Sequence, residues 1–292
     1  MGKKKLKARK NHKDSLFCDL FSNPERALSL YNAINGSSYR DPSQLTIVTM
    51  KDVLLLHQKN DVSILFDARL TLWEHQSTYN PNMPLRGLLY YAHNMEGLLG
   101  DRRRLLYRKS VVKIPAPAYY VLYNGIEEMP ERMEWKLSDA FLVPVAGYEW
   151  TAYVLNINLG KNMSIMEHCP ELKGYATLVE RIRGLVSNGL KLEDAIPEAV
   201  EGCIRDGVLS DYLRKMKGEA QGMLLTEFNE REWEEEIREE SREEGREEGR
   251  EEGANRLADL LKLLPPDSDE YRTAIHGTRE ERGALFQKYQ II

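Results

Sequence analysis

The chain has 292 residues, of which 42% are hydrophobic and 30% are charged, and its formal net charge is −5. This length allows one large domain, or one domain with an appendage, and the hydrophobic content is sufficient for a packed core. No apolar run reaches the roughly 18 residues that a membrane-spanning helix needs. The three cysteines lie far apart in sequence, which argues against a zinc site or a disulfide framework.

The basic N-terminus has no apolar segment after it, so it does not resemble a secretory signal. We therefore expect a cytoplasmic protein that has no membrane partner. The negative charge is concentrated in residues 219–252, which contain fifteen Glu and five Arg. The rest of the chain is mildly basic, and this permits a nucleic-acid substrate without proving one.

Six of residues 3–10 are Lys or Arg. This segment fits either a flexible arm that contacts phosphates or a solubilising tail. The pattern of residues 14–33 then predicts two helices, with Asp14 or Ser15 capping the first and Pro24 beginning the second. Residues 41–60 contain two apolar stretches, from which we expect a strand whose end is not defined by the pattern.

Two apolar runs follow within residues 60–90, and they predict the two strands of a hairpin. Asp61 opens the first strand, and Glu74 lies near the end of the second. Antiparallel pairing brings these carboxylates toward the same end of the hairpin. Because side chains alternate along a strand, Glu74 and Gln76 share one face, and His75 lies on the other.

A helix is predicted to run from Leu85 to about Leu99, and Pro84, directly before it, is a candidate for its first residue. Arg86 lies in the first turn, where a cation is unfavourable to the helix dipole. Its side chain therefore has another role, in binding a phosphate or a carboxylate, or else it extends along the surface.

Further strands are predicted at Tyr119–Tyr123 and Ala152–Ile157, and the helix and strand order indicates a mixed sheet. Residues 167–217 have helical apolar spacing throughout, with helices at His168–Val186 and Leu192–Arg205. We expect a small helical subdomain here.

The sequence REEG occurs at 242–245 and again at 246–249. Glu–Arg pairs at i,i+3 favour a helix, whereas glycines spaced by four disfavour it. The segment is thus either a long exposed helix, which could dimerise along its glycine line, or a solvated and partly disordered tether. A short helix from Glu270 to about Tyr289 is expected to close the chain.

Cleavage of a phosphodiester requires charge neutralisation on the phosphate and an activated water, and carboxylate-bound Mg²⁺ supplies both. Asp61 and Glu74 are the natural metal ligands, and the backbone carbonyl of His75 is a candidate third ligand. Gln76 is placed to orient the attacking water. On spacing alone, solvent-facing carboxylates at a strand edge remain the commoner interpretation.

The sequence also resembles the Rpn family of recombination-promoting nucleases, or putative transposases, of the PD-(D/E)XK superfamily. The residues that carry this resemblance are His12–Phe17, Asn60–Val62, Glu74–Ser77 with Met83, Leu85 and Arg86, Ile114–Pro115, Leu122–Gly125, Asn156–Asn158 and the Glu-Gly repeats.

The resemblance implies an α/β fold with a PD-(D/E)XK restriction-endonuclease-like core, in which a mixed sheet is flanked by helices and a C-terminal helical region follows. The implied activity is a metal-dependent DNA endonuclease linked to recombination, mobile elements or defence. Asp61 and Glu74 match the motif's acidic positions, Gln76 stands where the superfamily has Lys, and Asp14 matches the acidic residue of the first helix. Arg86 is expected to bind the substrate phosphate.

The resulting domain interpretation is a basic arm (1–13), a nuclease core (14–165), a helical subdomain (166–217) and an acidic repeat helix with the tail (218–292). The leading hypothesis is a Mg²⁺-dependent endonuclease that acts on DNA, with Mn²⁺ as an alternative ion. A homodimer or higher oligomer is a candidate assembly that the sequence leaves open. A second hypothesis is a weak or inactive nuclease fold that binds DNA or a partner and oligomerises through its C-terminal helix. In a third, the C-terminal segment folds separately and regulates the nuclease.

Overall fold

The structure, a computed structural model, describes residues 15–48, 62–289 and 291. The predictions for Asp14, for Asp61 and for the apolar stretch Val53–Leu56 lie outside these residues. The chain divides into two compact units, Met1–Arg231 and Glu232–Ile292. The candidate site lies in the first unit.

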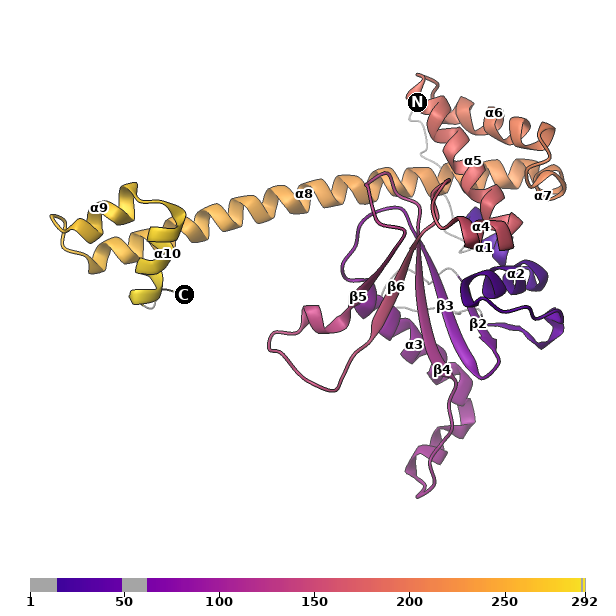
Figure 1. The fold of residues 1–292 in the computed structure, drawn as a ribbon, viewed down its shortest axis with the longest axis horizontal. Coiled ribbons are helices and arrows are strands. Elements are labelled where there is room, and N and C mark those ends of the chain that lie inside the picture. The colour runs from indigo at the N-terminus through magenta and orange to yellow at the C-terminus, as the bar shows by residue number, and fades with distance from the viewer. Residues whose placement is uncertain (1–14, 49–61, 290, 292) are drawn as a thin grey trace, which may run out of the picture. The chain divides into compact units, whose positions relative to one another are not determined.

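The first unit is a mixed α/β structure built on a six-stranded sheet, with the strand order β1-β2-β3-β4-β6-β5 (Figure 1). The strands are β1 (Thr46–Val48), β2 (Val62–Phe66), β3 (Arg69–Gln76), β4 (Ala116–Tyr123), β5 (Arg132–Lys136) and β6 (Thr151–Asn156). β3 pairs in parallel with β4, and β4 in parallel with β6, whereas the other pairs are antiparallel. The sheet is therefore mixed, as the sequence predicted.

The predicted hairpin is formed by β2 and β3. Asp67 and Ala68 connect the strands, and both have positive φ angles, of 48° and 55°. Two consecutive residues with positive φ are what a two-residue type I′ turn requires, and the twist of this turn matches that of the strands. The hydroxyl of Tyr39 donates a hydrogen bond of 2.8 Å to the carboxylate of Asp67, which holds the turn.

The helices of this unit begin and end at residues with recognisable local chemistry. They are α1 (Leu16–Phe21), α2 (Pro24–Asn35), α3 (Met83–Leu99), α4 (Met163–His168), α5 (Pro170–Ser187), α6 (Leu192–Arg205) and α7 (Ser210–Lys215), with short 3₁₀ helices η1 (Pro42–Gln44), η2 (Gly100–Tyr107) and η3 (Leu137–Ala140). Ser15, one of the two predicted capping residues, caps α1, and Asn23 caps α2 by accepting hydrogen bonds from two backbone amides. Gly36, with φ of 63°, ends α2.

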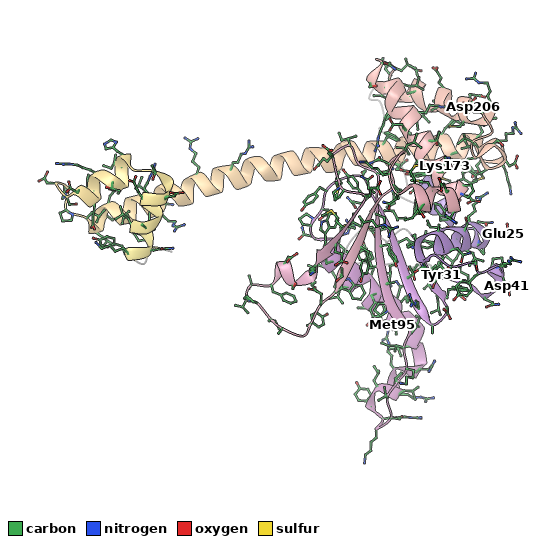
Figure 2. The ribbon with its side chains drawn as sticks, viewed as in Figure 1. Glu25, Tyr31, Asp41, Met95, Lys173 and Asp206 are labelled. Atoms are coloured by element: carbon green, nitrogen blue, oxygen red, sulfur yellow. The ribbon has the colours of Figure 1, made fainter. Side chains whose placement is uncertain are left out.

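The sheet separates two hydrophobic cores. On one face, α1, α2 and the helices from α4 to α7 share a single core with the strands. On the other face, α3 packs in a smaller core against β3, β4, β5 and β6. Figure 2 labels one residue from each, Tyr31 in the larger core and Met95 in the smaller. The helical region thus packs directly on the sheet and has no separate core of its own.

Some elements differ from the prediction. β5 was not expected, because its alternating residues are mostly polar and only Trp135 is buried. Two extra short helices are present, α4, which lies mostly before the predicted helical segment, and α7, which lies within it. The predicted closing helix is instead two helices, α9 (Asp269–His276) and α10 (Arg279–Lys288), separated at Gly277 and Thr278.

The Glu-rich segment forms part of one long helix, α8 (Lys217–Leu263), so the helical alternative of the two predicted is the one observed. Its beginning belongs to the first unit, where Ala220 and Leu224 are fully buried in the larger core. In the second unit, the end of α8 packs with α9 and α10 around Leu260 and Leu264. Thr278 and Glu281 form a capping box that fixes the start of α10.

Among the residues that the structure describes, no helix is both long enough and apolar enough to cross a membrane.

Candidate functional site

The candidate site lies at the C-terminal end of β3, where its side chains alternate between the two faces of the sheet. Glu74 pairs with Val121 of β4, His75 with Leu122 and Gln76 with Tyr123. Val121 and Tyr123 belong to the smaller core under α3, and Leu122 belongs to the larger core. Glu74 and Gln76 therefore share the α3 face and His75 lies on the opposite face, as strand alternation predicted.

Glu74 is an almost fully buried acidic residue, with only 3% of its side chain exposed. Its Oε1 atom accepts a charge-assisted hydrogen bond of 2.5 Å from the guanidinium of Arg86. The same guanidinium nitrogen donates to the hydroxyl of Tyr90 at 3.3 Å, one turn further along α3. Of the alternatives raised by the sequence for Arg86, the structure shows contact with a carboxylate.

The pKa of Arg86 reflects this environment. Burial is the largest single influence and lowers the pKa of the guanidinium, but the negative charge of Glu74, together with Tyr90 and Tyr119, raises the pKa by more in total. The net shift is upward, so Arg86 stays positively charged at every pH at which the protein is folded. A fixed positive charge thus lies against the Glu74 carboxylate.

A close contact between α3 and β4 places Arg86. A Cβ atom at Gly87 would lie 2.3 Å from the ring of Tyr119, so only glycine allows the helix to lie this near the strand. Further along α3, the buried amide of Asn94 donates a hydrogen bond of 3.1 Å to the hydroxyl of Ser63 on β2. These contacts fix α3 over the sheet and direct Arg86 toward β3.

Gln76 is also buried, and it lies two residues beyond Glu74 on the same face. Its side-chain amide donates a hydrogen bond of 2.6 Å to the hydroxyl of Thr78. Its backbone carbonyl accepts from the amide of Asn124, which extends the β3–β4 ladder past the strand end. Gln76 is therefore held in a defined orientation beside the carboxylate.

On the opposite face, His75 belongs to a buried polar group with Tyr175 of α5 and Glu227 of α8. The Tyr175 hydroxyl donates a short hydrogen bond to Glu227 Oε1. Because this hydroxyl has a single proton, His75 Nε2, 3.0 Å away, must be the donor to the Tyr175 oxygen. Phe17 stacks on the imidazole, with a centroid distance of 5.2 Å. The His75 side chain is thus engaged in packing and hydrogen bonding.

A group of asparagines anchors the loops at the ends of β4 and β6. The amide of Asn158 donates to the carbonyl of Gly125 at 2.9 Å and to Asn156 at 3.0 Å. Arg183 of α5 donates to the side-chain oxygen of Asn158 and to the backbone carbonyl of Asn124. The Asn-Gly and Asn-Ile-Asn segments that contributed to the family resemblance therefore meet beside the end of β3.

For a metal ion, the chemistry of the donors at this site is incomplete within the described residues. Mg²⁺ prefers carboxylate oxygens, and Glu74 supplies one carboxylate. Nowhere in residues 15–48, 62–289 and 291 do three His, Cys, Asp or Glu side chains gather so as to hold a metal. The structure does not describe Asp61 or Asp14. Val62, the residue after Asp61, pairs with Trp73, the residue before Glu74.

Tyr175 and Glu227 were not identified from the sequence. Tyr175 lies 100 residues from His75, and Glu227 a further 52 residues away, so no local spacing connects them. Glu227 also lies in the Glu-rich segment, whose composition indicates a solvated helix. The available signal was the apolar run Met223–Leu225 with Phe228, which marks the start of α8 as a packed segment.

Comparisons of the chain with protein-family models, with curated proteins and with solved structures gave no match.

Proposed function

We propose that the protein is a metal-dependent DNA endonuclease of the PD-(D/E)XK type, related to the Rpn nucleases that its motifs resemble. The observation that carries this proposal is the buried Glu74 carboxylate at the end of β3, with Gln76 oriented beside it on the same face. Arg86 offsets the cost of burying this carboxylate, and a buried ion-paired carboxylate of this kind is a candidate functional residue.

The order of the elements supports the proposal. A helix precedes three antiparallel strands, and α3 then crosses over to β4, which pairs in parallel with β3. The family resemblance implies this α-β-β-β-α-β arrangement. In such a crossover, the C-terminal ends of the two parallel strands lie at the same sheet edge, which is where ligands bind in many α/β proteins.

In the proposed reaction, a bound Mg²⁺ or Mn²⁺ ion supplies charge neutralisation and an activated water. Glu74 and Asp61 would hold the ion, with the His75 backbone carbonyl as the candidate third ligand and Asp14 as the further acidic residue. Gln76 would orient the water through its amide. It would not act as a general base, because an amide does not accept a proton. When the Arg86 guanidinium separates from Glu74, its positive charge becomes available to the scissile phosphate.

A plasmid assay tests the proposal. Supercoiled plasmid is incubated with Mg²⁺ and with the wild type, Asp61→Asn or Glu74→Gln, and relaxed product is measured on gels. We expect nicking by the wild type that EDTA abolishes, and a loss of at least about a hundredfold in both variants, as for removal of a charged group that acts in the transition state. Glu167→Gln serves as the matched control because Glu167 is exposed. Equal nicking by all four proteins contradicts the assignment.

One observation favours a second candidate, a nuclease fold that has lost strong catalysis and binds DNA or a partner, with α8 as the assembly element. The Glu74 carboxylate is already bound by Arg86 at 2.5 Å, so the ion pair competes with a metal for the same oxygen. DNA binding by the wild type in the absence of any Mg²⁺ or Mn²⁺ site is the result that favours this candidate.

A further inference from the structure

A strongly basic segment lies far from the candidate site, at the other end of α3. Residues 102–113 contain four Arg and two Lys, and they contain no acidic residue. They comprise most of η2 (Gly100–Tyr107) and part of the chain that leads to β4, and Figure 1 shows this segment projecting away from the sheet. We call residues 102–113 the basic projection. It is distinct from the basic residues 3–10.

All six cations of the basic projection are exposed. Within the described part of the chain, none of them forms an ion pair with a carboxylate. Six like charges in twelve residues repel one another, and Asp101, just before the segment, supplies only one negative charge against them. Such a surface gains free energy by contacting a polyanion, because each neutralised phosphate releases condensed counterions.

The geometry of η2 favours nucleic acid over a lipid surface. A 3₁₀ helix has three residues per turn, so Arg102, Arg103 and Arg104 occupy every position of one turn. Leu105, Leu106 and Tyr107 occupy the next. No side of the helix is apolar along its length, whereas a helix that lies on a membrane needs one continuous apolar face. Tyr107, which is 92% exposed, provides an aromatic ring beside the cations.

We propose that the basic projection is a DNA-binding surface that contacts the phosphate backbone of a duplex away from the candidate active site. Arginine guanidinium groups bind phosphate oxygens in a two-pronged geometry, and four of the six cations are arginines. From Arg86 to the end of α3 is thirteen residues, which corresponds to about 20 Å of helix. The projection lies beyond this length of helix, so its phosphate contacts are separate from the position at Glu74.

This inference rests on the proposed function for the choice of DNA as the partner, but its test does not depend on cleavage. Binding of a fluorescent 30-base-pair duplex is measured by anisotropy in EDTA, at several salt concentrations, with the full-length chain. The test variant combines Arg102→Ala, Arg103→Ala and Arg104→Ala. The matched control combines Arg205→Ala, Arg214→Ala and Lys215→Ala, which remove the same charge from other exposed positions.

If six phosphates are contacted, raising the salt from 50 to 200 mM weakens wild-type binding by about a thousandfold, and the same change weakens the test variant by only about fortyfold. The control variant retains the wild-type salt dependence. Tyr107→Ala weakens binding by a smaller factor and leaves the salt dependence unchanged, because it removes no charge.

Three results overturn the proposal. The first is a wild type that binds no duplex, and the second is a test variant with the wild-type salt dependence. The third is unchanged DNA binding with a loss of binding to phosphatidylserine vesicles, which assigns the basic projection to a membrane surface. Failure of the plasmid assay alone affects only the proposed catalysis, since the binding measurement contains no metal.

Discussion

The two faces of β3 at its C-terminal end carry different kinds of polar group. On the α3 face, Glu74 is bound by Arg86, which lies only 12 residues later and has a half-buried side chain. On the other face, His75 contacts Tyr175 and, through it, Glu227, which come from distant helices. The first group is an ion pair within one strand–helix unit, and the second is a hydrogen-bonded link between the sheet and the C-terminal helices.

This difference indicates a division of roles. A single ion pair at the start of one helix can open when a ligand competes for either partner. A buried tyrosine that is hydrogen-bonded to both a histidine and a glutamate is costly to separate, because each group would lose its partners away from water. We infer that the α3 face is the one that performs chemistry, while the His75 face holds the strand in place.

The largest expected effect comes from removing the start of α8. A chain that ends at Lys217 lacks Ala220, Leu224 and Glu227, which are buried in the first unit. Since loss of one buried leucine alone costs about 2–5 kcal/mol, we expect this truncation to leave the first unit unfolded or aggregated. A chain that ends at Arg231, the boundary between the units, should unfold cooperatively. Thermal denaturation of both truncations tests this, and similar melting temperatures would show that the His75 face is dispensable.

The next effect is on the α3 face. Arg86→Met leaves the buried Glu74 charge without this cation, and breaking a buried pair in this way costs about 3–5 kcal/mol, less any relief from the partial exposure of Arg86. The change in the free energy of unfolding is measured in urea. A cost below about 1 kcal/mol would mean that the pair behaves as a surface ion pair.

Glu74→Gln provides the matched partner of this experiment. Because the two side chains are in direct contact, the double variant Arg86→Met with Glu74→Gln should be less destabilised than the sum of the single variants, with a coupling of about 0.5–3 kcal/mol. Additive effects would contradict the pairing on which the α3 face depends.

A smaller effect tests how closely α3 approaches the sheet. Gly87→Ala forces a Cβ atom into the ring of Tyr119, and such overpacking costs about 1–3 kcal/mol. Gly97→Ala in the same helix meets no atom within 4 Å and should stabilise the protein by up to about 1 kcal/mol, since alanine is the better helix former. Equal effects at the two glycines would show that the helix does not need its close contact with β4.

An effect of similar size is expected on the His75 face. Tyr175→Phe removes the hydroxyl that joins His75 to Glu227, and the expected cost is about 1–3 kcal/mol because their polar atoms are left in a buried site. Tyr148→Phe, at a half-exposed tyrosine, is the control and should change stability little. If this face only holds the strand, Tyr175→Phe protein that remains folded keeps its plasmid-nicking activity. A loss of nicking without a loss of folding would assign a direct role to this face.

Local patterns in the sequence predicted much of the fold. The hairpin, the α3 start near Pro84, the start of α2 at Pro24 and the assignment of Glu74 and His75 to opposite faces all follow from short-range periodicity and helix-start chemistry, and the structure shows each of them. β5 escaped prediction because an edge strand that buries only Trp135 lacks the alternating apolar pattern of a half-buried strand.

The site was less predictable than the fold, for a physical reason. Arg86 in a first helical turn indicated an anion nearby, but the sequence could not distinguish a phosphate from a carboxylate, and only the distance between β3 and α3 identifies Glu74. The link from His75 to Tyr175 and Glu227 depends on tertiary packing over more than 100 residues. The roles of Asp61, Asp14, Glu74 and Gln76 in catalysis stay predictions.

Calorimetric titration with Mg²⁺ of the full-length wild type and of the Glu74→Gln variant tests the central claim most directly. Glu74→Gln keeps the size of the side chain and removes its charge, so the comparison isolates the carboxylate as a metal ligand. The account predicts at least one Mg²⁺ site in the wild type and its loss in the variant. An absence of Mg²⁺ binding in the wild type, or equal binding by both proteins, would contradict it.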